Sequence, residues 1–165
     1  RAKFFRGEVD KYTWVDTGSS YLPSEVVSAF LYAQLEVLDE IDRARLAIYR
    51  RYRDGLSGLA DRGLLTLPEP WNDGRHNAHM FYVLLNSEQA RDELARHLKN
   101  HDILAVHHYV PLHSSPYGRG CSRIGSSLDV TEDVSSRILR LPLFFELTEA
   151  EQAEVINEIH SYFGV

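Results

Sequence analysis

Residues 105–119 (AVHHYVPLHSSPYGR) bring three histidines, two tyrosines, two serines and an arginine into one short stretch. The stretch opens with apolar and aromatic residues, as a buried strand does. Pro111 and Pro116 prevent it from continuing as a strand, because proline cannot donate to a sheet ladder. Loops that follow a strand and carry hydrogen-bonding side chains often bind ligands. The stretch therefore predicts either a binding loop or an ordinary polar turn.

Metal binding is a second chemistry that these side chains could supply. His107, His108 and His113 are suitable ligands in kind. Adjacent residues on a strand point to opposite faces, however, so His107 and His108 cannot readily share an ion. The sequence has no H-E-x-x-H motif and no cysteine pair, and Cys121 has no obvious catalytic partner. We therefore predict no metal site, which leaves a metal-dependent hydrolase as a minor alternative.

A second candidate site is the turn Gly18-Ser19-Ser20, which directly precedes a helix start at Pro23 and Ser24. Free backbone N–H groups and hydroxyls at such a position suit an anion, especially phosphate. An ordinary turn followed by a helix cap would use the same residues. The sequence leaves both interpretations open.

Length, charge and cysteine content limit the class of protein. The chain has 165 residues, a formal net charge of −6 and a single cysteine. This length suffices for one domain with a real core. The negative charge argues against nucleic acid or an anionic membrane as the main partner, and no apolar run approaches the ~20 residues of a membrane helix. A lone cysteine excludes an internal disulfide and favours a reduced, cytoplasmic setting.

Hydrophobic periodicity predicts the elements that position these residues. Apolar residues recur at steps of three and four from Val27 to Leu56, which predicts a long helix opened by Pro23 and Ser24. A helix of about 30 residues would be ~45 Å long. That length exceeds one small core, so we expect either a break near residues 42–45 or contact with a second domain or subunit. A short edge strand ended by Pro68 is expected next.

The following segments predict a small sheet. A continuous apolar run at 79–85 indicates a strand buried on both faces, Ser87 can cap the next helix, and 103–109 indicates a second strand. Strand, helix and strand in this order fit a crossover unit.

The C-terminal segments complete the predicted fold. Thr131 can cap a short helix, and Thr148 with Glu151 forms a capping box for a last helix. Between them, residues 139–145 around Pro142 predict an edge strand or an extended segment. The whole predicts an α+β fold with a long N-terminal helical region and a small sheet that has helices on one face. We expect residues 1–22 to form an irregular interface arm and residues 23–165 to form the α+β domain.

Four stretches together resemble the C-terminal part of the DegT/DnrJ/EryC1/StrS family of sugar aminotransferases, which use pyridoxal phosphate. They are DKYTWVDTGSSYLPSEVVSAFLYAQLEVLDEI, RHNAHMFYVLL, LAVHHYVPLHSSPYGR and SSRILRLPLFFELTEAE. The resemblance covers essentially the whole chain. It implies the small C-terminal domain of a fold-type I aminotransferase that acts as a homodimer, with its large cofactor-binding domain upstream of residue 1.

The resemblance also implies roles for individual residues. The family motif G-[FY]-N-x-R carries an Asn that reaches the cofactor phosphate of the other subunit; here Ser20 takes its place, and Leu22 replaces the Arg. Ser20 is therefore the implied contact to the phosphate of the partner subunit's pyridoxal phosphate. The motif H-Y-x-P-L-H is intact. The implied lining of the nucleotide-sugar pocket is His108, Tyr109 and His113, with Tyr117 and Arg119 as weaker candidates.

The implied reaction is amino transfer from L-glutamate to dTDP-4-keto-6-deoxyglucose, in the synthesis of lipopolysaccharide or another surface polysaccharide. This chemistry needs a lysine that forms a Schiff base with the cofactor. Lys3, Lys11 and Lys99 are the only lysines, and none matches the family's lysine motif. We therefore expect a piece of a longer enzyme that contributes no catalytic residue and is inactive alone. A free-standing ligand-binding or regulatory α+β module is the alternative.

Overall fold

A computed structural model describes residues 21–69, 76–108 and 110–165 of the chain. The chain divides into two compact units, residues 1–37 and 38–165. In the described part of the first unit, α2 (Glu25–Glu36) begins at Ser24, whose hydroxyl accepts a 3.3 Å hydrogen bond from the backbone N–H of Val27. The predicted cap is confirmed. None of the residues of α2 is buried, although most of them are apolar.

The second unit begins with α3 (Leu38–Asp61), so the break in the helical region falls at Val37 and not at residues 42–45. Residues 42–45 continue the helix without interruption. The chain leaves α3 through Gly63, whose φ of +69° favours glycine. The remaining elements are β1 (Leu65–Thr66), β2 (Phe81–Leu85), α4 (Glu88–Asn100), β3 (Val106–His107), the 3-10 turn η1 (Leu112–Ser114), α5 (Gly118–Cys121), α6 (Asp129–Arg137), β4 (Ile138–Leu141) and α7 (Glu149–Tyr162).

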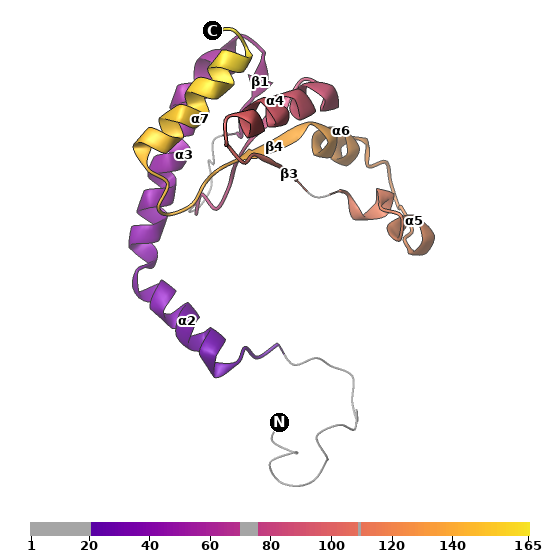
Figure 1. Cartoon of the computed structure of the whole chain (residues 1–165). Helices are drawn as coiled ribbons and strands as arrows, with labels where there is room; N and C mark the ends of the chain where they lie inside the picture. Colours follow the sequence, from indigo (N-terminus) through magenta and orange to yellow (C-terminus); the bar gives the residue numbers. More distant parts are fainter. Residues whose placement is uncertain (1–20, 70–75, 109) are drawn as a thin grey trace, which may run out of the picture. The chain divides into compact units, whose positions relative to one another are not determined.

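The four strands form one sheet in the order β1-β2-β4-β3, and every pairing is antiparallel. Because β2 and β3 both run antiparallel to β4, they run parallel to each other with β4 between them (Figure 1). The predicted strand–helix–strand unit is thus present as a split crossover. The expected edge position of β1 is confirmed. The prediction of an edge strand around Pro142 is wrong: β4 is central, and Pro142 follows its last ladder residue.

Three helices, α3, α4 and α7, pack their apolar residues together with one face of the sheet in a single core. Along β2, Phe81, Val83 and Leu85 are fully buried, whereas the alternate residues are only partly buried. The strand is therefore buried on one face and not on both. The predicted α+β class, with helices followed by a small sheet, is confirmed.

Local cap chemistry determines where two of these helices begin. Ser87 accepts from the N–H of Ala90 at the start of α4, and Thr148 with Glu151 forms the expected capping box of α7. Thr131 does not cap α6, which already begins at Asp129. None of the helices in the described parts of the chain combines the length and apolar character needed to cross a membrane.

Candidate functional site

The stretch 105–119 forms a strand end and a compact loop. β3 ends at His107, and the chain then turns through η1 into the short helix α5. Ser115 Oγ donates to the carbonyl oxygen of Leu112 at 2.7 Å and accepts from the N–H of Gly118 at 3.0 Å. Ser114 Oγ donates to the carbonyl oxygen of Pro111 at 3.2 Å. Both serine hydroxyls therefore hold the loop backbone.

A close backbone approach fixes the identity of one loop residue. A Cβ placed on Gly118 would lie 1.7 Å from the carbonyl oxygen of Leu112 and 2.9 Å from Ser115 Oγ. No larger residue fits without moving the backbone, because a carbonyl oxygen cannot rotate away as a flexible side chain can. The loop shape is thus specified by Gly118 and the two serines.

His113 connects the loop to helix α6. Its Nε2 lies 2.7 Å from Oε1 of Glu132, and its side chain is only 16% exposed. The contact is an ion pair whenever the imidazole is protonated. This nitrogen is therefore engaged within the protein.

A cavity of about 530 Å³ lies beside the loop. Its wall combines the start of α4, the end of β3, the loop and the middle of α6. The side chains that matter for its chemistry are Glu88, Arg91, Asp92, His107, His108 and Glu132.

Carboxylates dominate the charge of this cavity. Arg91 is 7% exposed, and its guanidinium Nη2 lies 3.2 Å from Glu88 Oε1. Its Nε lies 2.8 Å from Asp92 Oδ1, although the N–H does not point at that oxygen well enough for a hydrogen bond. The lining thus carries one guanidinium and three carboxylates, those of Glu88, Asp92 and Glu132. By Coulomb's law a diphosphate is disfavoured here, while a neutral hydroxyl-rich group finds both donors and acceptors.

The structure separates the residues that the sequence grouped together. His108 lines the cavity, and His113 reaches its wall through Glu132. Tyr117 is 84% exposed, and Arg119 is exposed on α5. Ser20 and Tyr109 lie outside the described residues. Sequence reasoning missed Arg91 and Glu132; Arg91 stands three residues before Leu94, at the spacing of the buried face of α4.

Neither a pyridoxal-phosphate site nor a metal site is formed by the described part of the loop. Lys99 is the one lysine within the described ranges, and it is exposed near the end of α4, away from the cavity lining. The described residues therefore supply no lysine amine at the cavity that could tether this cofactor. Donor atoms close enough to share a metal ion occur elsewhere in the described residues, in His97, His101 and Glu158.

Comparison with known proteins places this chain beside larger enzymes. The model of the DegT/DnrJ/EryC1/StrS aminotransferase family matches residues 2–160. A relative from Micromonospora megalomicea subsp. nigra, described as dTDP-3-amino-3,4,6-trideoxy-alpha-D-glucose transaminase, is 31% identical over 161 residues. That alignment covers 96% of this chain and 42% of the relative.

Two solved structures share the fold. DesV of S. venezuelae, in complex with a ketimine intermediate, is 29% identical with a TM-score of 0.79 over 97% of this chain and 42% of its own. The structure of ntda from Bacillus subtilis with bound cofactor PMP is 22% identical with a TM-score of 0.77, over 96% of this chain and 37% of its own. The chain thus spans about two fifths of the length of each of these relatives.

Proposed function

The chain belongs to the DegT/DnrJ/EryC1/StrS aminotransferase family, and we propose that it is the C-terminal part of a pyridoxal-phosphate-dependent nucleotide-sugar aminotransferase. The observation that carries this proposal is the family match over residues 2–160. In the proposed enzyme, the chain supplies substrate contacts and a contact to the cofactor phosphate of the partner subunit. The amine that holds the cofactor comes from residues outside this chain, so the chain alone does not transaminate.

The reaction that we propose moves an amino group from L-glutamate to the C4 keto group of dTDP-4-keto-6-deoxyglucose. The motifs of the chain resemble those of dTDP-4-amino-4,6-dideoxygalactose transaminase, whose product enters lipopolysaccharide and related surface polysaccharides. The Micromonospora relative is also named for a dTDP-sugar, but the sugar in its name carries the amino group at C3. Analysis of the aminated product therefore decides between the two ring positions.

The charge of the loop cavity suggests how the substrate is oriented. A neutral sugar can exchange hydrogen bonds with His108 and the carboxylates at the cavity, whereas its diphosphate is disfavoured there. We place the diphosphate outside the cavity, toward the exposed guanidinium of Arg119. The exposed ring of Tyr117 offers a surface for stacking of the thymine base. Tyr109 and His113 complete the proposed pocket, His113 by holding the loop against Glu132.

Helix α2 offers an apolar surface on which the rest of the proposed homodimeric enzyme can pack. Its apolar side chains include Val26, Phe30 and Tyr32, which are 81%, 72% and 65% exposed. A helix with apolar residues on all sides is normally buried in a folded protein. We propose that α2 packs against the cofactor-binding part of the enzyme or the second subunit. Ser20, just before this helix in sequence, would then reach the phosphate of the partner's cofactor.

The test uses the full-length parent enzyme and the variant His108→Ala. Loss of one or two hydrogen bonds to the sugar should raise the KM for the dTDP-sugar about tenfold. The half-reaction with L-glutamate should stay close to wild type, because glutamate does not need this contact. His79→Ala is the matched control, since His79 is exposed and lies outside the loop. Equal loss in both half-reactions would show that His108 supports the fold and not the sugar.

A further inference from the structure

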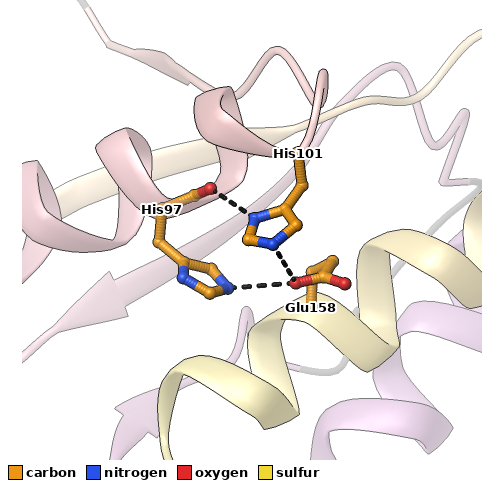
Figure 2. A group of neighbouring side chains, drawn as sticks. All are labelled: His97, His101 and Glu158. Carbon is orange, nitrogen blue, oxygen red and sulfur yellow. Dashed lines mark hydrogen bonds and ion pairs between the residues drawn. The ribbon is translucent and has the colours of Figure 1, made fainter.

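Three side chains on two helices converge at the end of α4. His97 lies in the last turn of α4, His101 is the C-cap residue that follows the helix four positions later, and Glu158 comes from α7. Figure 2 shows both imidazole rings directed at the carboxylate. His97 Nε2 lies 3.1 Å from Glu158 Oε2, and His101 Nε2 lies 3.5 Å from the same oxygen.

The contact made by Nδ1 of His101 shows which of its two ring nitrogens carries the proton. His101 Nδ1 lies 2.9 Å from the carbonyl oxygen of His97, which can only accept a hydrogen bond. Nδ1 therefore carries a proton, and in the neutral ring Nε2 presents a lone pair. That lone pair faces Oε2 of Glu158, which is itself an acceptor. Two acceptors in this arrangement call for a cation between them, either a proton or a metal ion.

We propose that His97, His101 and Glu158 bind one divalent transition-metal ion, with Zn²⁺ as the expected occupant. Zinc bonds of about 2.0–2.1 Å in a tetrahedral site separate neighbouring donor atoms by about 3.4 Å. The two observed separations, 3.1 and 3.5 Å, bracket that value, and all three donor atoms lie within 4.8 Å of one another. Two imidazoles and one carboxylate form a ligand set that zinc accepts, with water in the fourth position.

The surroundings of the three residues match those of a zinc site. The hydrogen bond from His101 Nδ1 to a backbone carbonyl is the outer contact that orients a metal-bound histidine. The group also lies at the C-terminal end of α4, where the helix dipole favours a cation. The three side chains are 24%, 45% and 23% exposed, which leaves an entry path for the ion. The bound ion would clamp α4 to α7.

Spectroscopic titration of the metal-free chain with Co²⁺ tests the proposal, because tetrahedral Co²⁺ has strong visible bands. We expect one equivalent of Co²⁺ to bind and to be displaced by Zn²⁺. Loss of an outer contact typically lowers metal affinity about 10–100-fold. Each ligand variant should lower the affinity for Co²⁺ by more than this; the variants are His97→Ala, His101→Ala and Glu158→Gln. His79→Ala removes an exposed histidine from another part of the chain and should leave the affinity unchanged.

Thermal unfolding followed by circular dichroism supplies a second readout. Zn²⁺ should raise the melting temperature of the wild-type chain and of His79→Ala, but not that of the three ligand variants. Melting in the presence of EDTA establishes that each variant folds. The proposal is overturned if Co²⁺ gives no visible bands, or if the ligand variants bind as well as wild type. A wild-type melting temperature that Zn²⁺ leaves unchanged would overturn it too.

Discussion

The side-chain amide of Gln152 on α7 donates a 2.7 Å hydrogen bond to the backbone carbonyl oxygen of Ile48 on α3. Gln152 is fully buried, and its Oε1 accepts a 2.7 Å hydrogen bond from Nη1 of Arg51. One amide thus satisfies two groups across the contact between these helices. Arg51 also pairs with Glu149 at 3.0 Å, so the contact carries a small polar network within an otherwise apolar core.

The variant Gln152→Leu removes both hydrogen bonds at nearly constant volume. We expect it to lower the free energy of unfolding by about 1–3 kcal/mol, because the guanidinium of Arg51 loses a partner in a partly buried position. Urea unfolding measures the change. Gln89→Leu is the matched control: Gln89 is exposed on α4 and bonds only to Glu93, so its loss should stay within about 0.5 kcal/mol. Equal changes in the free energy of unfolding for the two variants would mean that the buried hydrogen bonds of Gln152 add no stability.

Two glycines inside α3 are expected to respond differently to replacement by alanine. A Cβ at Gly58 meets nothing within 4 Å, whereas a Cβ at Gly55 would lie 2.9 Å from Cδ1 of Ile156 on α7. Gly58→Ala should therefore stabilise the chain by about 0.5–1 kcal/mol through helix propensity. Gly55→Ala should lose that gain, because Ile156 must shift. Urea unfolding midpoints compare the two variants, and a stabilisation by Gly55→Ala as large as that of Gly58→Ala would contradict the contact.

Gly118→Ala should deform the loop. The added Cβ collides with the carbonyl oxygen of Leu112, so the hydrogen bonds of Ser115 must break or move. Backbone amide NMR signals of residues 112–118 report this change. Gly120→Ala, in the same short helix with open space around its Cα, is the control and should leave the signals of 112–118 in place. Unchanged signals in Gly118→Ala would mean that Leu112 can move away without cost.

The capping box of α7 should make the free energy of unfolding depend on pH in the acidic range. Thr148 donates to Oε2 of Glu151 from its hydroxyl at 2.6 Å and from its N–H at 2.9 Å, and these bonds lower the pKa of Glu151. The unfolded state then binds the proton more tightly than the folded state. The contribution of the box is therefore present above the unfolded pKa and is lost as the pH falls through the lowered folded pKa.

Thr148→Val tests this dependence, because it removes the hydroxyl donor. The pKa of Glu151 should rise, and unfolding free energy should vary less with pH in the acidic range; NMR titration and urea unfolding measure the two effects. Thr131→Val is the control, since Thr131 does not cap α6. A pKa of Glu151 that stays the same in Thr148→Val would assign the shift to the backbone donor alone.

Local chemistry is the part of this fold that the sequence predicts well. Ser24, Ser87 and the Thr148–Glu151 pair cap the expected helices, because a cap depends on residues three positions apart. The place of β4 could not be predicted in the same way. Pro142 suggested an edge strand, but it follows Leu141, the last paired residue, and pairing partners depend on contacts far apart in sequence.

The candidate site was predicted only in part for a similar reason. The loop and His108 stand out because their side chains are adjacent in the sequence. Arg91 and Glu132 reach the same cavity from helices on either side of the loop, which no local spacing reveals. The histidines 97 and 101 have a visible spacing of four, but Glu158 joins them only through the packing of α7 on α4.

The late position of β4 in the chain has a consequence for synthesis. Residues 138–141 lie between β2 and β3 in space but follow both in sequence. Until the ribosome has released them, the two earlier strands each keep an open edge, and such edges pair readily with other chains. Translation that stops before this point would therefore leave an aggregation-prone remnant, and chaperone demand should peak just before β4 emerges.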